Sequence, residues 1–221
     1  MVVASGAALA AVAVLSFVLG SIPWGIVIGK LFFHQDIRAV GSGNIGTTNA
    51  MRALGKKGGA AVFVLDFGKG VVAGLLTVMI GNLALDGSAP FAGTLATPGD
   101  LLGMAFFCCI AGHVFSPWLG FHGGKGIAVA AGAMVWTFGL PGFGLELALF
   151  IVLVLVTRYV SLGSVAAAVL CVGLSFYFYW GDWPAWALCT AGALLVIWAH
   201  RENLHRLASG TERRVGDKKE A

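Results

Sequence analysis

The stretch that decides the fold is "AALAAVAVLSFVLGSIPWGIVI", residues 7–28. It contains no charged residue, and residues 1–29 as a whole carry none. A secretory signal peptide would begin with a basic region, which is missing here. Lys30 follows the run directly, and positive charge marks the cytoplasmic flank of a membrane span. We therefore predict a membrane-spanning helix with the N-terminus outside and residue 30 inside.

The composition of the whole chain is that of a membrane protein. Of its 221 residues 58% are hydrophobic and 11% are charged, whereas soluble domains carry about 25% charged residues. The mean hydropathy is +0.90, and a soluble fold could not bury that much apolar surface. The cysteines lie in apolar stretches without metal-ligand spacing, so we interpret them as small buried hydrophobic residues: Cys108, Cys109, Cys171 and Cys189. The sequence predicts no metal, cofactor or nucleic-acid partner.

Apolar segments recur along the chain and predict its organisation. They cover residues 7–28, 60–80, 101–115, 127–140, 143–156, 162–180 and 185–199. A single helix over 127–157 would measure ~46 Å, too long for a hydrocarbon core of ~30 Å. Pro141-Gly142 interrupts this stretch, which predicts two short spans joined by a tight outer turn. We predict an all-α integral membrane protein with about seven transmembrane helices, forming a single domain over residues 1–221.

The distribution of charge supports this topology. The predicted inner segments, 30–57, 113–126, 157–161 and 200–221, hold 13 of the 14 Lys and Arg residues and all five histidines. The fourteenth basic residue, Lys69, lies within a span. The outer segments, 81–100, 141–142 and 181–184, contain no Lys or Arg but carry Asp86, Asp100 and Asp182. This is the pattern of the positive-inside rule, and it predicts a cytosolic C-terminus with a basic tail at about 200–221.

The first polar motif is "GSGNIGTTNAMR", residues 41–52, on the predicted inner side. Gly41, Gly43 and Gly46 have the spacing of the dinucleotide fingerprint G-x-G-x-x-G, but the strand before it and the acidic residue after it are missing. Glycine N–H groups and short polar side chains nevertheless suit a bound phosphate. The candidate ligands are Ser42, Gly43, Asn44, Gly46, Thr48, Asn49 and, on a short helix behind the loop, Arg52. The alternative is a flexible polar loop whose Gly and Asn residues form turns.

A second motif, "GHVFSPWLGFHGGKG", ends in a lysine surrounded by glycines. Gly123, Gly124 and Gly126 leave the ammonium of Lys125 unscreened. Gly126 opens a helix, and a helix N-terminus favours negative charge. The alternative is a lysine that marks the inner interface. His113 stands near the end of an apolar span, which is typical of a hydrogen-bonded structural histidine.

Further polar residues stand within or beside the apolar segments. "LDFGKG" places Asp66 and Lys69 on one helix face within a span, either as a mutually neutralising pair or as a site lysine with a supporting aspartate. The polar residues at the predicted inner ends of the spans are Arg158, Ser161, Ser164, His200, Asn203 and Arg206. A basic tail beside a membrane span commonly only binds anionic lipid. Lipid binding does not explain the presence of His200 and Asn203 in this tail.

The usual signatures of acyl-transfer enzymes are missing from the sequence. No G-x-S-x-G elbow occurs, and no histidine begins an H-x-x-x-x-D pattern, because the residues five positions on are Ala39, Trp118, Ile127, His205 and Gly210. An enzyme built on these motifs must act without a covalent nucleophile or a His–Asp dyad.

The chain closely resembles the PlsY family, bacterial membrane acyltransferases that use acyl-phosphate to acylate glycerol 3-phosphate. The resemblance covers residues 10–212 and rests on "GSGNIGTTNAMR", "LDFGKG", "GHVFSPWLGFHGGKG" and "HRENLHRLASGTE", in that order on one membrane face. Ile45 stands where the family often has proline, which changes loop stiffness rather than chemistry. The resemblance implies seven spans in the bacterial inner membrane, a site facing the cytosol, and formation of 1-acyl-glycerol 3-phosphate with release of phosphate.

The resemblance also implies site residues. The family's motifs fall on Ser42, Arg52, Lys125, His200 and Asn203, and its site serine on Ser164 or Ser161. Ser164 is favoured because it lies one turn further into the helix. We assign Arg52, His200 and Asn203 chiefly to glycerol 3-phosphate, and Ser42 and Ser164 to oxygens of acyl-phosphate. Lys125 would neutralise the charge that develops during transfer.

The chemistry of the substrates agrees with this assignment. Acyl-phosphate is a mixed anhydride with a good leaving group, so direct attack by a hydroxyl needs no acyl-enzyme. The general base is either His200 or a phosphate oxygen of the substrate, and the lack of a His–carboxylate pair favours the substrate. The predicted partners are acyl-phosphate, glycerol 3-phosphate and membrane lipid, with the enzyme that makes acyl-phosphate as a candidate protein partner.

The strongest alternative function is a membrane transporter or channel for phosphorylated small solutes. It would predict polar residues that continue to the outer face, whereas only Asp66 and Lys69 penetrate the spans. The inverted repeats of many transporters are not visible in this sequence.

Overall fold

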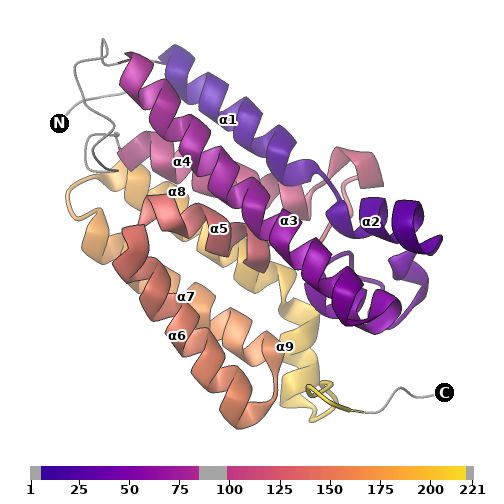
Figure 1. The fold of residues 1–221 in the computed structure, drawn as a ribbon. Helices are drawn as coiled ribbons and strands as arrows, with labels where there is room; N and C mark the ends of the chain where they lie inside the picture. Colours follow the sequence, from indigo (N-terminus) through magenta and orange to yellow (C-terminus); the bar gives the residue numbers. More distant parts are fainter. Residues whose placement is uncertain (1–5, 85–98, 218–221) are drawn as a thin grey trace.

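The computed structural model describes residues 6–84 and 99–217, which form helices and connecting turns. The helices are α1 (Gly6–Ser21), α2 (Trp24–Phe33), η1 (Ile37–Ala39), α3 (Thr47–Ala84), α4 (Gly99–Val114), η3 (Pro117–Leu119), α5 (Ile127–Thr137), α6 (Gly139–Thr157), α7 (Val160–Phe178), α8 (Trp183–Ala199) and α9 (Arg201–Ala208). Figure 1 shows them as an elongated bundle, and the all-α prediction is confirmed. Most of the predicted outer segment 81–100, including Asp86, lies outside the described residues.

The first apolar run lies in one candidate membrane span, as predicted, but it is broken into two helices instead of one continuous helix. Helix α1 ends at Ser21 and α2 begins at Trp24. Pro23 lies between them, and a proline has no N–H to continue the helical ladder. The carbonyl of Ile22 accepts a hydrogen bond from Trp24 N at 3.1 Å. The break leaves this stretch of backbone open to side chains from other helices.

Helix α3 is longer than predicted and includes part of the first polar motif. It begins at Thr47 and contains a kink at Gly55, where φ is 74° and ψ is −175°. A left-handed φ of this kind favours glycine. Arg52 lies in the short helical piece before the kink, which confirms the predicted helix behind the loop. The kink therefore separates the polar start of α3 from its apolar part.

The turn between the two short predicted spans lies earlier than Pro141-Gly142, and that prediction is wrong in its position. Helix α5 ends at Thr137 and α6 begins at Gly139, whose φ is 65°. Pro141 lies in the first turn of α6, where its missing N–H has no helical partner to lose. The glycine, and not the proline, makes the turn.

Helix length supports fewer spans than the sequence predicts. Among the described residues, five helical segments are long and apolar enough to cross a membrane, with α1 and α2 counted together over Gly6–Phe33. The number is six if α8 and α9, bent by 53°, are one broken span. Helix α5 has 11 residues and measures about 16 Å, roughly half of a hydrocarbon core. The protein is a helical integral membrane protein, and the number of seven spans stays a prediction.

Close helix contacts form the core of the bundle. Helix α1 packs against α4, α3 against α5, and α4 against α8. A Cβ on Gly70 of α3 would meet the backbone of Val129 in α5, and one on Gly132 of α5 would meet that of Phe67. Small residues at such crossings are typical of membrane helices. Leu155 on the outer face of α6 is 74% exposed, as expected for a side chain in contact with lipid.

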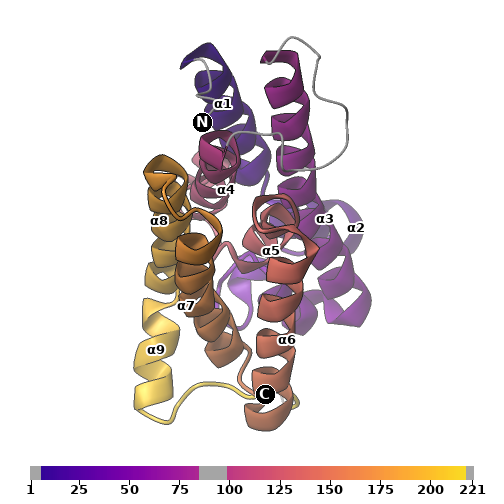
Figure 2. The same ribbon diagram turned by 90° about the vertical axis from the view of Figure 1, so that its left-hand side faces the viewer.

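The polar motifs meet at one end of the bundle. Figure 2 shows α9 at the lower end and the start of α1 at the upper end. The loop before α3, the starts of α5 and α7, and the segment that follows α8 all line a common cavity at the lower end. The fold thus gathers into one place motifs that lie far apart in the sequence.

Candidate active site

The cavity at this end has a volume of about 670 Å³ and is lined by five segments together with Asp66 and His113. Four of them are the loop 41–49 with Arg52, Lys125 with the start of α5, the start of α7, and the junction of α8 and α9. The fifth is the C-terminal segment 211–217, which we call the strap. Such a cavity is large enough for small-molecule substrates.

The charges in the cavity favour the binding of an anion. Its four carboxylates each face a basic side chain: Asp66 faces Lys69, Glu202 and Glu212 face Arg206, and Asp217 faces Arg158. Within the described part of the chain, neither Arg52 nor Lys125 forms an ion pair. A guanidinium and an ammonium that share a cavity and pair with none of its carboxylates are typical of a phosphate site.

Most of the predicted site residues line the cavity together. They are Ser42, Asn44, Gly46, Thr48, Asn49, Arg52, Lys125, Ser161, Ser164, His200 and Asn203. Gly43 and Lys69 do not line it, and Gly123 and Gly124 line a smaller neighbouring pocket of about 200 Å³ that shares Lys125. The fold therefore brings the predicted catalytic residues to one cavity, whereas four predicted substrate-binding residues stand outside it.

Asn49 shapes the glycine loop from beneath. Its side chain is buried, and Nδ2 donates to Ile37 O at 2.7 Å and to Asn44 O at 2.8 Å. Its Oδ1 accepts from Ser42 N at 2.9 Å. Both donors of the Asn49 amide are thus used within the protein, so the residue positions Ser42 and Asn44 rather than offering its own donors to a substrate.

The glycine turn before Lys125 is held against the end of α4. Gly123 N donates to Val114 O at 2.9 Å and Gly124 N donates to His113 O at 3.0 Å, so these two N–H groups are not available to an anion. Gly126, with φ of 81°, precedes the first residue of α5, which confirms the predicted helix start. The turn serves to aim the Lys125 side chain into the cavity.

A chain of hydrogen bonds runs from Lys125 to the strap. Lys125 Nζ donates to Asn203 Oδ1, and Asn203 Nδ2 donates to Glu212 Oε1 at 2.6 Å. Arg206 Nε donates to Glu212 Oε2 at 2.8 Å. Burial lowers the pKa of Lys125, and the positive charge of Arg206 adds to this effect. Asn203 is therefore the link that holds Lys125 in place.

Glu212 is a site residue to which the sequence assigned no role. Burial alone would raise the pKa of its carboxyl, but the hydroxyl of Ser161 and the donors of Asn203 and Arg206 hold the pKa below its ordinary value. The carboxylate therefore stays ionised at neutral pH. Its position at the end of the "HRENLHRLASGTE" motif was the available signal, but its partners became evident only from the fold.

His200 presents an acceptor to the cavity. Its Nδ1 lies 2.8 Å from Val196 O, so Nδ1 carries the proton that the carbonyl accepts. Burial lowers the pKa of His200 from 6.5 to about 4, and the charge of Lys125 acts in the same direction. The imidazole is therefore neutral at pH 7, with Nε2 as a hydrogen-bond acceptor. Such an acceptor suits a hydroxyl group better than a phosphate.

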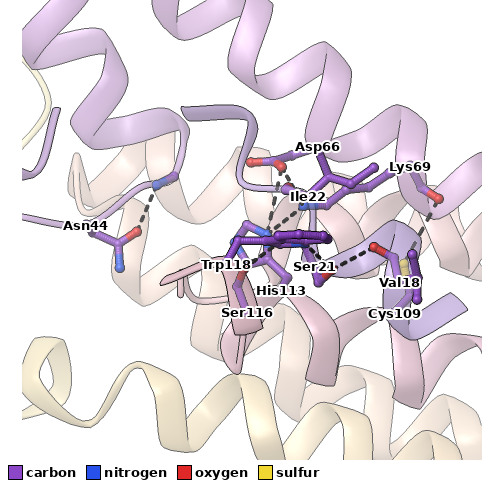
Figure 3. Close-up of polar contacts among 11 residues, drawn as sticks. Val18, Ser21, Ile22, Asn44, Asp66, Lys69, Cys109, His113, Ser116 and Trp118 are labelled. Atoms are coloured by element: carbon purple, nitrogen blue, oxygen red, sulfur yellow. Dashed lines mark hydrogen bonds and ion pairs between the residues drawn. The ribbon is translucent and has the colours of Figure 1, made fainter. Parts of the chain in front are cut away.

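A buried triad lies at the inner end of the cavity. Figure 3 shows Lys69 between Asp66, His113 and the carbonyl of Ile22. Lys69 Nζ lies 2.8 Å from Asp66 Oδ1, 2.9 Å from Ile22 O and 2.9 Å from His113 Nδ1. The ammonium thus donates a hydrogen bond to Ile22 O, lies within hydrogen-bond distance of His113 Nδ1 and forms an ion pair with Asp66. Lys69 therefore neutralises Asp66 and caps the broken backbone after α1, and His113 is the hydrogen-bonded histidine that the sequence predicts.

The loop after α4 is tied to the same place. Ser116 Oγ donates to Ser21 O at 2.7 Å, and Trp118 Nε1 donates to Ser21 Oγ at 2.9 Å (Figure 3). The end of α1, the middle of α3 and the end of α4 thus form one rigid floor beneath the glycine turn. A membrane-embedded helical protein with a cation-rich cavity on such a floor belongs to the class of integral membrane proteins that handle phosphorylated substrates.

Comparison with known proteins identifies the family. The glycerol-3-phosphate acyltransferase family matches residues 10–210. The chain is 39% identical to glycerol-3-phosphate acyltransferase 2 of Lactobacillus johnsonii, over 90% of this chain and 84% of that protein. It is 38% identical to glycerol-3-phosphate acyltransferase of Listeria monocytogenes, over 91% and 93% of the two chains.

Solved structures agree with the sequence comparison. The crystal structure of PlsY, an integral membrane glycerol 3-phosphate acyltransferase, in its glycerol 3-phosphate form aligns with a TM-score of 0.79 and 34% identity, over 96% of both chains. A second PlsY structure, in the lysophosphatidic acid form, aligns with a TM-score of 0.76 and 33% identity, again over 96% of both chains. The chain belongs to the glycerol-3-phosphate acyltransferase family, and the resemblance to PlsY is confirmed.

Proposed function

We propose that this protein transfers an acyl group from acyl-phosphate to the 1-hydroxyl of glycerol 3-phosphate, which gives lysophosphatidic acid and inorganic phosphate. One observation carries the proposal: side chains suited to two phosphates line a single cavity at the end of a membrane bundle. They are Ser42, Arg52, Lys125, Ser164, His200 and Asn203. The relatives named glycerol-3-phosphate acyltransferase and the two PlsY forms support the same reaction.

The protein is proposed to lie in the bacterial inner membrane as a single domain with seven spans, its N-terminus outside. The positive-inside distribution of Lys and Arg supports a cavity on the cytosolic side. In that orientation a soluble phosphate arrives from the cytosol and the acyl chain from the lipid. A direct supply of acyl-phosphate by the enzyme that makes it is compatible with this geometry.

Binding of the acceptor is assigned to Arg52 and the α8–α9 junction. The guanidinium of Arg52 binds the phosphate in a bidentate manner, and Asn203 holds Lys125 near it. Nε2 of His200 accepts a hydrogen bond from a glycerol hydroxyl, because its Nδ1 proton is used by Val196. Ser42 and Ser164 are assigned to oxygens of the acyl-phosphate.

The transfer step needs no acyl-enzyme. The 1-hydroxyl oxygen attacks the acyl carbon, the bond between that carbon and the phosphate oxygen breaks, and inorganic phosphate leaves. Lys125 stabilises the negative charge that develops. The hydroxyl proton passes to a phosphate oxygen, because the pKa of His200 is about 4 and the second pKa of a phosphate monoester is about 6. The phosphate is thus the stronger base by about two pKa units, roughly 100-fold.

The proposal is tested with purified protein in detergent and a phosphate-release assay. Release should require both acyl-phosphate and glycerol 3-phosphate, should be matched by lysophosphatidic acid formed, and should not occur with acyl-CoA as donor. Comparable rates with acyl-CoA would contradict the donor assignment. Binding of glycerol 3-phosphate without turnover would favour a transporter instead.

A further inference from the structure

The strap lines the cavity and is fixed at both ends. At its start, Glu212 accepts hydrogen bonds from Asn203 at 2.6 Å and from Arg206 at 2.8 Å. At its far end, Val215 N donates to Arg158 O at 2.8 Å, and Arg158 Nε donates back to Val215 O at 2.9 Å. The strap thus joins α9 to the corner between α6 and α7.

The corner provides a second contact for the strap. Arg214 Nε donates to the hydroxyl of Tyr159 at 3.0 Å, and its guanidinium lies 5.0 Å from the centre of the Tyr159 ring. Arg158 Nη2 also lies 3.8 Å from Asp217 Oδ1. These contacts are exposed and polar, so each is weak, but together they hold one conformation of the segment between Glu212 and Val215.

Arg213 lies between the two anchored ends and lines the cavity. Its positive charge is the strongest electrostatic influence on Arg52, ahead of Glu212 and Arg206. Two guanidinium groups directed at one cavity repel each other, and an anion between them relieves the repulsion. A phosphate monoester carries a charge of about −1.5 to −2 and three acceptor oxygens, which suits two such groups.

We propose that Arg213 binds the phosphate of the glycerol 3-phosphate acceptor opposite Arg52, and that the contact of the strap with Arg158 and Tyr159 places it there. This inference rests on the proposed function. The acceptor is chosen over the donor because Arg213 acts on Arg52, the residue assigned to the acceptor. Arg213 is also exposed, as expected for a residue that meets a soluble substrate arriving from the cytosol in the proposed orientation.

The first test compares Arg213→Gln with Lys57→Gln in purified full-length protein. Lys57 is an exposed cation of α3 that does not line the cavity, so it controls for the loss of one positive charge. Arg213→Gln should raise the KM for glycerol 3-phosphate about tenfold or more, as expected for a lost charged hydrogen bond. It should leave kcat and the KM for acyl-phosphate within about twofold. Arg213→Lys should recover part of the loss, because it keeps the charge without the fork.

The second test asks whether the contacts of the strap with Arg158 place Arg213 in the cavity. Arg158 has φ of 64°, so Arg158→Gly keeps the backbone conformation and removes the side chain that holds Val215 and Asp217. It should raise the KM for glycerol 3-phosphate in the same direction. In the Arg158→Gly, Arg213→Gln double variant the KM should stay within about twofold of Arg213→Gln alone, because both changes remove the same contact.

Three results would overturn the inference while the parent protein remains active with both substrates. They are a KM for glycerol 3-phosphate in Arg213→Gln equal to that of Lys57→Gln, a rise confined to the KM for acyl-phosphate, and additive effects of Arg158→Gly and Arg213→Gln. Failure of the proposed function is a separate outcome, since the parent protein would then show no turnover that depends on both substrates.

Discussion

Gly124 offers a direct test of how the buried floor controls catalysis. A Cβ at this position would collide with Nε2 of the His113 ring and would lie 2.9 Å from its Cδ2. Heavy atoms pack best at about 3.5–4.0 Å, so the turn must move by roughly 1 Å or more to accept alanine. The ring cannot give way easily, because its Nδ1 is held by Lys69 at 2.9 Å. The displacement should therefore pass to Lys125, the next residue.

The expected effect of Gly124→Ala is on kcat. A misplacement of about 1 Å in a catalytic group can lower the rate about 100-fold, so we expect kcat to fall by roughly 10- to 100-fold. Overpacking of this kind destabilises a protein by about 1–3 kcal/mol, which leaves the protein folded. Gly124 does not have a positive φ, so backbone strain does not complicate the substitution.

The assay is steady-state phosphate release at saturating concentrations of both substrates, with Tm measured on the same preparation. Gly173→Ala is the matched control, because a Cβ at Gly173 of α7 meets no atom within 4 Å. The control should retain full kcat. If Gly124→Ala also kept kcat within twofold of the parent, the placement of Lys125 would not depend on its contact with His113, and the reasoning would be refuted.

Four further predictions follow from the site and the topology. Lys125→Ala should lower kcat about 100-fold or more with both substrates saturating, and near-normal kcat would contradict its role. Arg52→Lys should raise the KM for glycerol 3-phosphate about tenfold because it loses the bidentate fork, as Michaelis curves would show. Because burial lowers the pKa of His200 from 6.5 to about 4, its neutral form stabilises the fold above pH 6.5. That contribution of about 3 kcal/mol is lost as the pH falls from 6.5 to 4, so His200→Gln should flatten the dependence of Tm on pH over this range. A cysteine in place of Ser88 should react with an impermeant thiol reagent on intact cells and one in place of Ser209 should not; the reverse pattern would invert the topology.

Much of the candidate site could be predicted from the sequence because its chemistry is local. The Gly41–Gly46 loop, the helix that carries Arg52 and the helix that begins after Gly126 are all short-range features. Each motif contains glycine, hydroxyl or cationic residues, which are types that bind phosphate. Their meeting in one cavity was predicted only through their common membrane side and the resemblance to a family.

The helix breaks show where local reasoning is less reliable. Pro141 and Pro23 have the same missing N–H, yet Pro23 separates two helices and Pro141 lies in the first turn of one. The difference lies two residues before Pro141, where Gly139 takes a positive φ of 65° and makes the turn itself. A proline therefore locates a helix boundary only to within a few residues. Whether the proline lies in the break or in the first turn of the next helix depends on the residues around it.

Composition and charge by themselves determine that this chain forms apolar membrane helices with its basic motifs on one face, because burial in lipid and the positive-inside rule act on residue type and not on partners. The tertiary structure alone decides what each polar residue does. Lys69 is directed to Asp66, Ile22 and His113, so it is structural. Glu212 becomes the acceptor that holds Asn203 and Arg206. The contacts of Lys69 with Ile22 and His113 join residues that are 47 and 44 positions apart in the chain, and only the packing of the helices sets those distances.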